Sequence, residues 1–124
     1  MNILHTIAGG PVGGAERFFV DLAIALQEAG HDSRAVMRPN QARGQLLDQA
    51  GVRHADVPFK RWLDFRTPRT IRRMAKDMRA DIVLAWMGRA ARATPEGDYA
   101  RIARHGGYYN LSSFRGFDAQ VCNT

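Results

Sequence analysis

The 124-residue chain carries a formal net charge of +6 and has a sequence pI near 10.4, which favours anionic partners. Its length fits one domain with a core of its own, and its single cysteine, Cys122, excludes an intramolecular disulfide and fits a reducing cytoplasm. Because no charged segment followed by an apolar one opens the chain, and Asp21 interrupts the longest apolar stretch, the sequence predicts neither a secretory signal nor a membrane span.

The chain begins with an apolar run from Ile3 to Ile7 that leads into a glycine-rich stretch. Such a run is typical of a central parallel strand buried on both faces, and we expect His5 within it to be a core histidine with satisfied hydrogen bonds. Glycines at positions 9, 10, 13 and 14 allow positive φ angles and a close approach of a ligand to the backbone. Because a strand, a glycine-rich turn and a helix start aim backbone N–H groups at an anion, the sequence predicts a phosphate or sugar-phosphate site here.

A dinucleotide-binding fingerprint is disfavoured by the same stretch. No register of the four glycines supplies the spacing G-x-G-x-x-G. The fingerprint also requires an acidic residue near the end of the second strand, where this chain has Arg38, which suits a phosphate better than a ribose. An NADP-type reductase domain is therefore a third-ranked hypothesis, which saturable NADPH binding would revive.

The first helix is predicted from Ala15 to Ala29, ended by Gly30. Its spacing predicts that one apolar face packs on the sheet, made of Phe18, Leu22, Ala25, Leu26 and Ala29. Glu16 falls in the first turn, where the helix dipole favours a carboxylate, and a hydrogen bond from Glu16 to a substrate hydroxyl is the alternative explanation.

Further along, the sequence predicts strands over residues 31–37 and 52–57 and a helix over 43–50. This βαβαβ order predicts an α/β fold: a Rossmann-like, doubly wound and mostly parallel sheet flanked by helices. In such sheets ligands bind beyond the carboxyl ends of the strands.

Basic and aromatic side chains alternate in the segment 58–66. Trp62 and Phe65 could stack on a sugar acceptor or enter a lipid headgroup layer, with Lys60 and Arg61 binding phosphate. The alternative, which we favour from the sequence, is that the aromatic rings tuck into the core beneath a solvated basic surface.

Thr67 has the features of a helix N-cap, because Pro68 suits the first helical position. The helix that follows has an apolar side at Ile71 and Met78 and is otherwise rich in arginine. Its basic side is either an ordinary solvated face or a stripe that contacts an anionic membrane.

The second half of the chain continues the alternation of strands and helices. We predict strands over 81–86, 100–105 and 119–122, a loop over 87–89, a short helix over 90–93 and a helical turn over 112–116. Cys122, at the end of the last strand, is expected to be a small buried side chain rather than a nucleophile.

The motif G-G-A-E-R at 13–17, followed by an apolar helix, resembles the first loop and helix of the family 4 retaining glycosyltransferases, which have the two-domain GT-B fold. The resemblance continues at 81–86, at 106–109 and at 123–124, so it spans nearly the whole chain. It implies that the chain is the acceptor-side N-terminal domain of such an enzyme. Because the family's second, nucleotide-binding domain is not in this sequence, we expect a truncated domain that is inactive alone.

The resemblance also implies an activity and its partners. The intact enzyme would transfer a sugar from a nucleotide-sugar donor to a saccharide or lipid-linked acceptor, with retention and without a metal or other cofactor. Lipopolysaccharide or polysaccharide biosynthesis would be its setting. We expect a cytoplasmic protein, with peripheral contact at the inner face of an anionic membrane as a further possibility.

By this resemblance the site residues fall into three groups. The donor diphosphate would lie near Gly13, Gly14 and Arg17. Glu16 and His105 would act in catalysis by orienting sugar hydroxyls, since relatives often carry a histidine near the end of the fifth strand. The acceptor would contact Trp62, Trp86, Arg104 and Tyr108.

Other functions have less support. A stand-alone Rossmann-like module that binds a phosphorylated ligand without catalysis is the runner-up hypothesis. A metal site is not predicted, because His5, His31, His54 and His105 are far apart and have no cysteine or carboxylate at ligand spacing. Nucleic-acid binding is not predicted either, because charge alone supports it.

Overall fold

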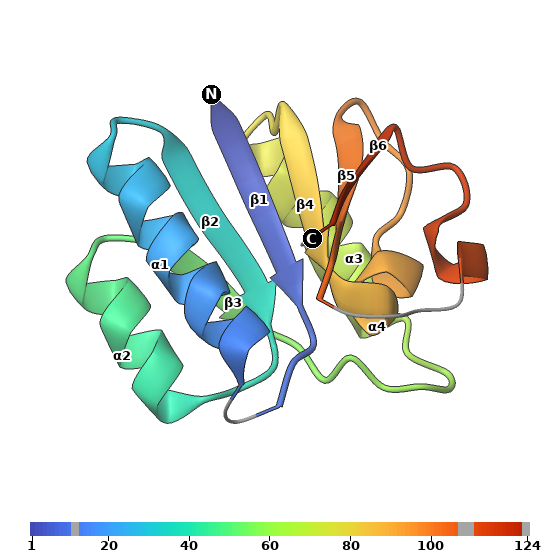
Figure 1. Cartoon of the computed structure of the whole chain (residues 1–124), viewed down its shortest axis with the longest axis horizontal. Coiled ribbons are helices and arrows are strands. Elements are labelled where there is room, and N and C mark those ends of the chain that lie inside the picture. The colour runs from blue at the N-terminus through green and yellow to red at the C-terminus, as the bar shows by residue number, and fades with distance from the viewer. Residues whose placement is uncertain (11–12, 107–110, 123–124) are drawn as a thin grey trace.

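Six strands of the described residues form one parallel sheet in the order β3-β2-β1-β4-β5-β6 (Figure 1). The computed structural model describes residues 1–10, 13–106 and 111–122. The strands are β1 Asn2–Ile7, β2 Asp32–Met37, β3 Arg53–Asp56, β4 Ile82–Trp86, β5 Ala100–His105 and β6 Ala119–Cys122. Every neighbouring pair is parallel, which confirms the predicted doubly wound sheet.

The register brings the ends of the central strands to one edge of the sheet. Ile7, the last residue of β1, is paired with Met37 of β2 on one side and with Trp86 of β4 on the other. The glycine-rich loop after β1, the loop after β3 and the start of α4 therefore lie at the same edge (Figure 1).

Helices cover both faces of the sheet. On one face lie α1 Gly14–Glu28 and α2 Gln41–Gln49, and on the other lie α3 Arg66–Asp77 and α4 Met87–Ala93 (Figure 1). A 3-10 turn, η1 Leu111–Phe114, contacts α4. The predicted loop over 87–89 is therefore the first turn of a helix, which begins directly at the end of β4.

The two faces of the sheet bury separate apolar clusters. Ile7, Phe19 and Trp86 belong to the cluster beneath α1, whereas Leu4 and Ile71 belong to the cluster beneath α3. Residues of a strand alternate between the two faces, so a strand buried on both sides must be apolar at nearly every position. This explains the apolar run that opens the chain.

The buried face of α1 differs from the predicted one. Phe19, Val20 and Ala23 are its buried residues, whereas Phe18 is 48% exposed. Because apolar residues occupy more than one side of this helix, their spacing fits two neighbouring faces, and the contacts with the sheet select between them.

Two helices begin two residues earlier than the sequence predicts, and in each a nearby side chain accepts a hydrogen bond from a first-turn N–H group. Asn40 accepts a hydrogen bond from Arg43 N and starts α2 two residues earlier than predicted. Thr67 is not the N-cap of α3, which begins at Arg66; its N–H donates to Asp64 Oδ1 at 3.0 Å. Asp64 thus satisfies a first-turn N–H group from outside the helix.

The end of the sheet carries one further difference. Cys122 is exposed rather than buried, because β6 is an edge strand and all four of its residues are exposed. Among the described helices, none combines the length and the apolar character that a membrane span requires.

His5 is confirmed as a core histidine with satisfied hydrogen bonds. Its side chain is fully buried, Trp86 Nε1 donates to its Nδ1 at 3.2 Å, and Nε2 lies 3.3 Å from Ser33 Oγ. Since an indole N–H can only donate, Nδ1 accepts and the ring proton sits on Nε2. Burial lowers the pKa of His5 from 6.5 to about 4.

This pKa predicts a loss of stability in acid. Between pH 6.5 and about 4 the unfolded chain binds a proton on His5 that the folded chain does not, so the free energy of unfolding falls as the pH falls. The loss is expected to reach on the order of 3 kcal/mol once the pH is below about 4. Urea unfolding across this range measures it, and a His5 ring that titrates near 6.5 in NMR spectra of the folded protein would contradict it.

Candidate functional site

The candidate site is a pocket at the carboxyl edge of the sheet, where β1 and β4 lie side by side. Strand order reverses at this point, since β1 leads to β2 on one side and β4 leads to β5 on the other. Ligands of open α/β sheets bind at such a switch point. The pocket has a volume of about 330 Å³ and is lined by Ala8, Gly9, Trp86, Met87, Gly88, Arg89, Arg92 and Ser113.

A second hollow adjoins this pocket. It has a volume of about 570 Å³ and lies between the segment 59–65 and α4. Arg89 and Arg92 line both hollows, so the two are joined at a pair of exposed guanidinium groups. Arg92 Nη1 also donates to Ser113 Oγ at 3.3 Å, which links α4 to η1.

Arg92 and Ser113 are not among the site residues predicted from the sequence. The available signal was the spacing of Arg89 and Arg92, three positions apart on a helix that directly follows a buried strand, which places them on one helix face. Recognising it required knowing that the helix begins at Met87.

Glu16 folds back over the glycine-rich loop. Gly10 N donates to its Oε1 at 3.1 Å, and a Cβ built on Gly9 or Gly13 would lie 2.3 Å or 2.2 Å from a carboxylate oxygen of Glu16. Gly13 has a φ of 168°, and the left-handed φ angles among the described glycines belong to Gly30, Gly51 and Gly116. The expectation of positive φ in this loop is therefore wrong for its glycines, and Gly9 and Gly13 are explained by the close approach of Glu16.

Arg43 of α2 holds the same loop from the other side. Its Nη2 donates to Gly10 O at 2.8 Å, and its side chain is buried. Burial lowers the pKa of Arg43, while the negative charge of Glu16 acts in the opposite direction. The carbonyl and the N–H of Gly10 are thus bound by Arg43 and Glu16, a pairing that sequence spacing does not reveal.

Arg17 and the start of α1 lie at the outer side of the loop. The side chain of Arg17 is 84% exposed and pairs with Asp21 at 3.7 Å, one helical turn away. Gly13 is the N-cap residue of α1, and no hydrogen bond from a described side chain caps the helix there. Gly14, with open space around its Cα, begins the helix.

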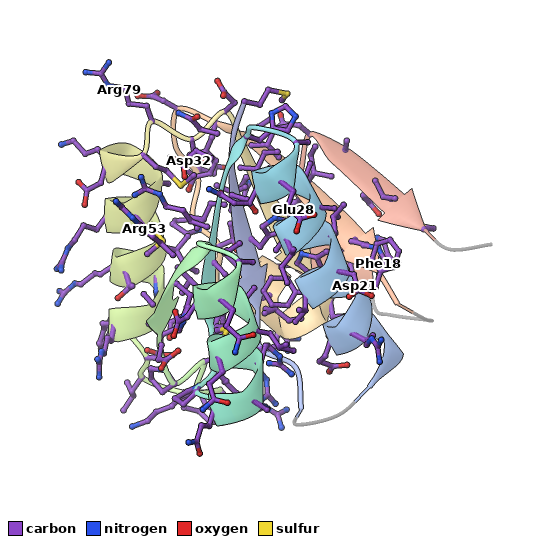
Figure 2. All side chains as sticks on the ribbon, turned by 90° about the vertical axis from the view of Figure 1, so that its left-hand side faces the viewer. Phe18, Asp21, Glu28, Asp32, Arg53 and Arg79 are labelled. Atoms are coloured by element: carbon purple, nitrogen blue, oxygen red, sulfur yellow. The ribbon has the colours of Figure 1, made fainter. Side chains whose placement is uncertain are left out.

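The Trp86 side chain belongs to the core, and the residue also contributes to the wall of the pocket at the switch point. Its side chain is fully buried, with the ring of Phe19 at 5.8 Å. The guanidinium of Arg104 lies 4.7 Å from the centroid of the Trp86 ring and 4.4 Å from that of Phe18. Phe18 projects from α1 on the side toward β5 and β6 (Figure 2). An indole at 0% exposure supports the edge of the sheet from within the core.

His105 and Arg104 face opposite sides of the sheet. Neighbouring residues of a strand alternate, so Arg104 stacks beneath α1, whereas His105 packs 4.1 Å from the Phe114 ring. His105 Nε2 also lies 2.8 Å from Gln120 Oε1. Neither residue lines the pocket at the switch point, and Tyr108 lies outside the described residues.

The segment 60–66, here called the aromatic loop, exposes its apolar side chains. Trp62, Leu63 and Phe65 are 78%, 87% and 65% exposed, whereas Phe59 is buried. The interpretation that the aromatic rings of this segment tuck into the core is therefore wrong for Trp62 and Phe65.

Hydrogen bonds explain why the loop points outward. Asp64 Oδ2 accepts from Lys60 N at 2.8 Å and from Thr67 Oγ1 at 2.5 Å, which closes the loop at its base. Arg38 donates to the carbonyls of Pro58 and Phe59 instead of facing a phosphate. Desolvation raises the pKa of Asp64, but hydrogen bonds to its carboxylate outweigh that effect and hold the pKa below its usual value.

The described residues contain no group of three or more histidine, cysteine or carboxylate side chains that could hold a metal ion. The edge presents backbone N–H groups, guanidinium groups and the Glu16 carboxylate, a set that suits an anionic, hydroxyl-rich ligand.

Comparisons with known proteins agree with this geometry. The chain is 36% identical over 118 residues to the lipopolysaccharide core biosynthesis glycosyltransferase LpsE of Rhizobium meliloti (strain 1021), covering 93% of this chain and 35% of that protein. Among solved structures, a glycosyltransferase from Rickettsia africae matches with a TM-score of 0.71 at 20% identity, over 88% of this chain and 30% of the other. HepE from Anabaena, solved in complex with UDP and glucose, matches with a TM-score of 0.59 at 18% identity, over 84% of this chain and 29% of the other.

The structural matches establish the fold, and the chain spans about a third of the length of the curated relatives it matches. The sequence model described as Glycosyltransferase Family 4 matches residues 12–117, which is most of the chain. The chain therefore belongs to glycosyltransferase family 4.

Proposed function

We propose that the chain is the acceptor-side N-terminal domain of an enzyme that transfers a sugar from a nucleotide-sugar donor to a saccharide or lipid-linked acceptor, with retention at the anomeric carbon. The observation that carries the proposal is the pocket at the switch point, which places Gly9 of the glycine-rich loop beside Arg89 and Arg92. Backbone amides and guanidinium groups are the natural partners of a diphosphate.

In this proposal the glycine-rich loop serves the donor. Backbone groups of Gly13 and Gly14, with the side chain of Arg17, stabilise the charge that develops on the leaving diphosphate. HepE, a structural neighbour, was solved in complex with UDP-glucose, which supports a nucleotide sugar as the donor class. A second, nucleotide-binding domain completes the site in the intact protein.

The remaining proposed roles concern the sugar and the acceptor. Glu16 holds Gly10 in place and orients a sugar hydroxyl when the donor enters, because its carboxylate already lies across the loop. His105 has the same orienting role at the end of β5. The acceptor lies along the joined hollows, with Trp62 in the wall of the larger one. Contacts of the acceptor with Arg104 and Tyr108 are further parts of the proposal.

The setting we propose is lipopolysaccharide core biosynthesis, the pathway in the name of the relative LpsE. The reaction takes place in the cytoplasm, with the enzyme in peripheral contact with the inner face of the membrane. The net charge of +6 supports such contact, because that face is anionic.

The arginine pair provides a direct test in the full-length enzyme. Arg89→Gln and Arg92→Gln each remove a guanidinium from the wall shared by both hollows, and each is expected to lower kcat/KM by roughly 10-fold to 100-fold, because a hydrogen bond to a charged group contributes about 1.5–3 kcal/mol.

Arg79→Gln is the matched control, since it removes the same charge at the end of the molecule opposite the glycine-rich loop (Figure 2). Transfer to a lipopolysaccharide core acceptor is assayed with each nucleotide sugar in turn. If all three variants behave alike, the pocket is not the reaction site. If donor binds but no acceptor is ever glycosylated, a non-catalytic binding module is the better description.

A further inference from the structure

The aromatic loop gathers large apolar side chains where they face solvent. Trp62, Leu63 and Phe65 are the three most exposed large apolar residues among those described, at 78%, 87% and 65%. Single exposed apolar side chains are ordinary on protein surfaces, but three within four positions form a patch, and patches of this kind mark a surface that binds something.

This exposure is built into the loop rather than the result of a loose chain. Asp64 closes the loop by accepting from Lys60 N and Thr67 N, and Thr67 Oγ1 accepts from Phe59 N at 3.1 Å. Leu63, at the tip, has a φ of 51°, a left-handed conformation that a leucine keeps only when its surroundings hold it there.

The charge around the patch is strongly positive. Residues 60–73 contain six basic side chains and one carboxylate, and that carboxylate, Asp64, is engaged by the hydrogen bonds that close the loop. Arg89 and Arg92 add two more guanidinium groups across the adjoining hollow. The apolar tip is thus surrounded by cations that complement an anionic surface.

These features together favour one kind of binding partner for the aromatic loop. Leu63 and Phe65 offer no hydrogen-bonding group with which to recognise a sugar, but both gain free energy on entering hydrocarbon, and the indole of Trp62 suits the boundary between water and lipid. Lysine and arginine beside such a tip suit the lipid phosphates. We infer that the aromatic loop inserts its tip, Trp62, Leu63 and Phe65, into an anionic lipid bilayer, with Lys60, Arg61 and Arg66 at the headgroups.

Docking in this way would orient the site. The hollow beneath the loop shares Arg89 and Arg92 with the pocket at the switch point, so it would open at the bilayer surface. An acceptor anchored in the membrane could then reach the pocket without leaving the lipid. The inference deepens the peripheral contact in the proposed function and rests on it for the identity of the acceptor.

Intrinsic fluorescence tests the insertion directly in this chain. Of its two tryptophans, Trp62 is 78% exposed and Trp86 is 0% exposed, so an emission change on adding lipid reports the loop. Phosphatidylglycerol vesicles are expected to shift the emission to shorter wavelength, whereas phosphatidylcholine vesicles leave it unchanged. Trp62→Phe supplies the baseline, because the buried Trp86 is then the only tryptophan.

Paired variants separate the apolar and the ionic parts of binding. Leu63→Ser is expected to weaken binding to phosphatidylglycerol vesicles by about tenfold. Leu46→Ser, which removes a 50% exposed leucine from α2, should leave binding unchanged. Raising the salt concentration from about 0.01 M to about 1 M, which shortens the Debye length from about 30 Å to about 3 Å, should weaken binding of the unaltered chain.

Three outcomes would overturn the inference. They are an unshifted Trp62 emission with phosphatidylglycerol vesicles, an equal effect of Leu63→Ser and Leu46→Ser, and an emission shift caused by soluble saccharide but not by vesicles. Vesicle binding is measured without nucleotide sugar, and transfer can be assayed with a soluble acceptor, so failure of the inference and failure of the proposed function are distinguishable.

Discussion

Replacement of Trp86 by alanine is expected to lower the free energy of unfolding by about 3–5 kcal/mol. The indole is fully buried at the end of β4, packs against Phe19 and donates to His5 Nδ1. Its removal leaves a cavity at the centre of the cluster beneath α1, an unpaired buried nitrogen on His5, and an Arg104 guanidinium that has lost one of its two stacking rings.

Trp62→Ala is the matched control for this measurement. Trp62 is 78% exposed, so its removal is expected to change the free energy of unfolding by no more than about 0.5 kcal/mol. Urea unfolding followed by far-UV circular dichroism compares the two variants without relying on tryptophan emission. Equal losses of stability would mean that Trp86 does not have the core position described here.

Gly13→Val in the intact enzyme is expected to lower the rate of transfer by at least about 100-fold while leaving the fold in place. Gly13 has a φ of 168°, an extended conformation that valine also adopts, so the backbone is not strained. The new Cβ would lie 2.2 Å from Glu16 Oε2, which forces the carboxylate away from Gly10 N. The loop then loses the side chain that holds it, and the valine methyl groups occupy the space over the backbone amides.

Gly14→Ala is the comparison variant, because it keeps the backbone groups of Gly14 that the donor is proposed to contact and adds one methyl group that meets nothing within 4 Å; alanine also suits the first position of a helix. Steady-state transfer is measured for both variants, with urea unfolding to check stability. The double variant Gly13→Val with Glu16→Ala then shows whether the loss acts through Glu16, since the two effects are non-additive if it does. Near-normal turnover of Gly13→Val would remove the glycine-rich loop from the mechanism.

The elements of the fold were largely predictable because their signals are local. The strands over 100–105 and 119–122 were placed correctly from alternation and turn residues, and Gly30 and Gly51 follow α1 and α2 with φ angles of 94° and 75°. The predictions were wrong where a local sequence pattern was compatible with two different structures. The first helix is apolar on more than one side, so its periodicity could not decide between Phe18 and Phe19 as the buried ring.

The candidate site was predictable only in part. The motif at 13–17 located the glycine-rich loop, and the order of strands placed it at the carboxyl edge. The arginine pair on α4 was missed because the predicted helix start fell between Arg89 and Arg92, which assigned the two residues to different elements. The aromatic loop was assigned to the core because aromatic residues are usually buried, and the local hydrogen bonds by which Asp64 closes the loop were not recognised in the sequence.

The sequence by itself determined the α/β class, the strand and helix order, the glycine-rich turn and the family resemblance, because each depends on residues that are neighbours along the chain. Only the tertiary structure decided that Trp86 meets His5 across 81 positions and that Arg43 binds Gly10 across 33. It also decided that Arg104 and His105 face opposite sides of the sheet, and that Trp62 faces solvent while Trp86 does not. These outcomes depend on which strands pair and in which register, and pairing between distant segments is set by the packing of the whole chain rather than by any one stretch of it.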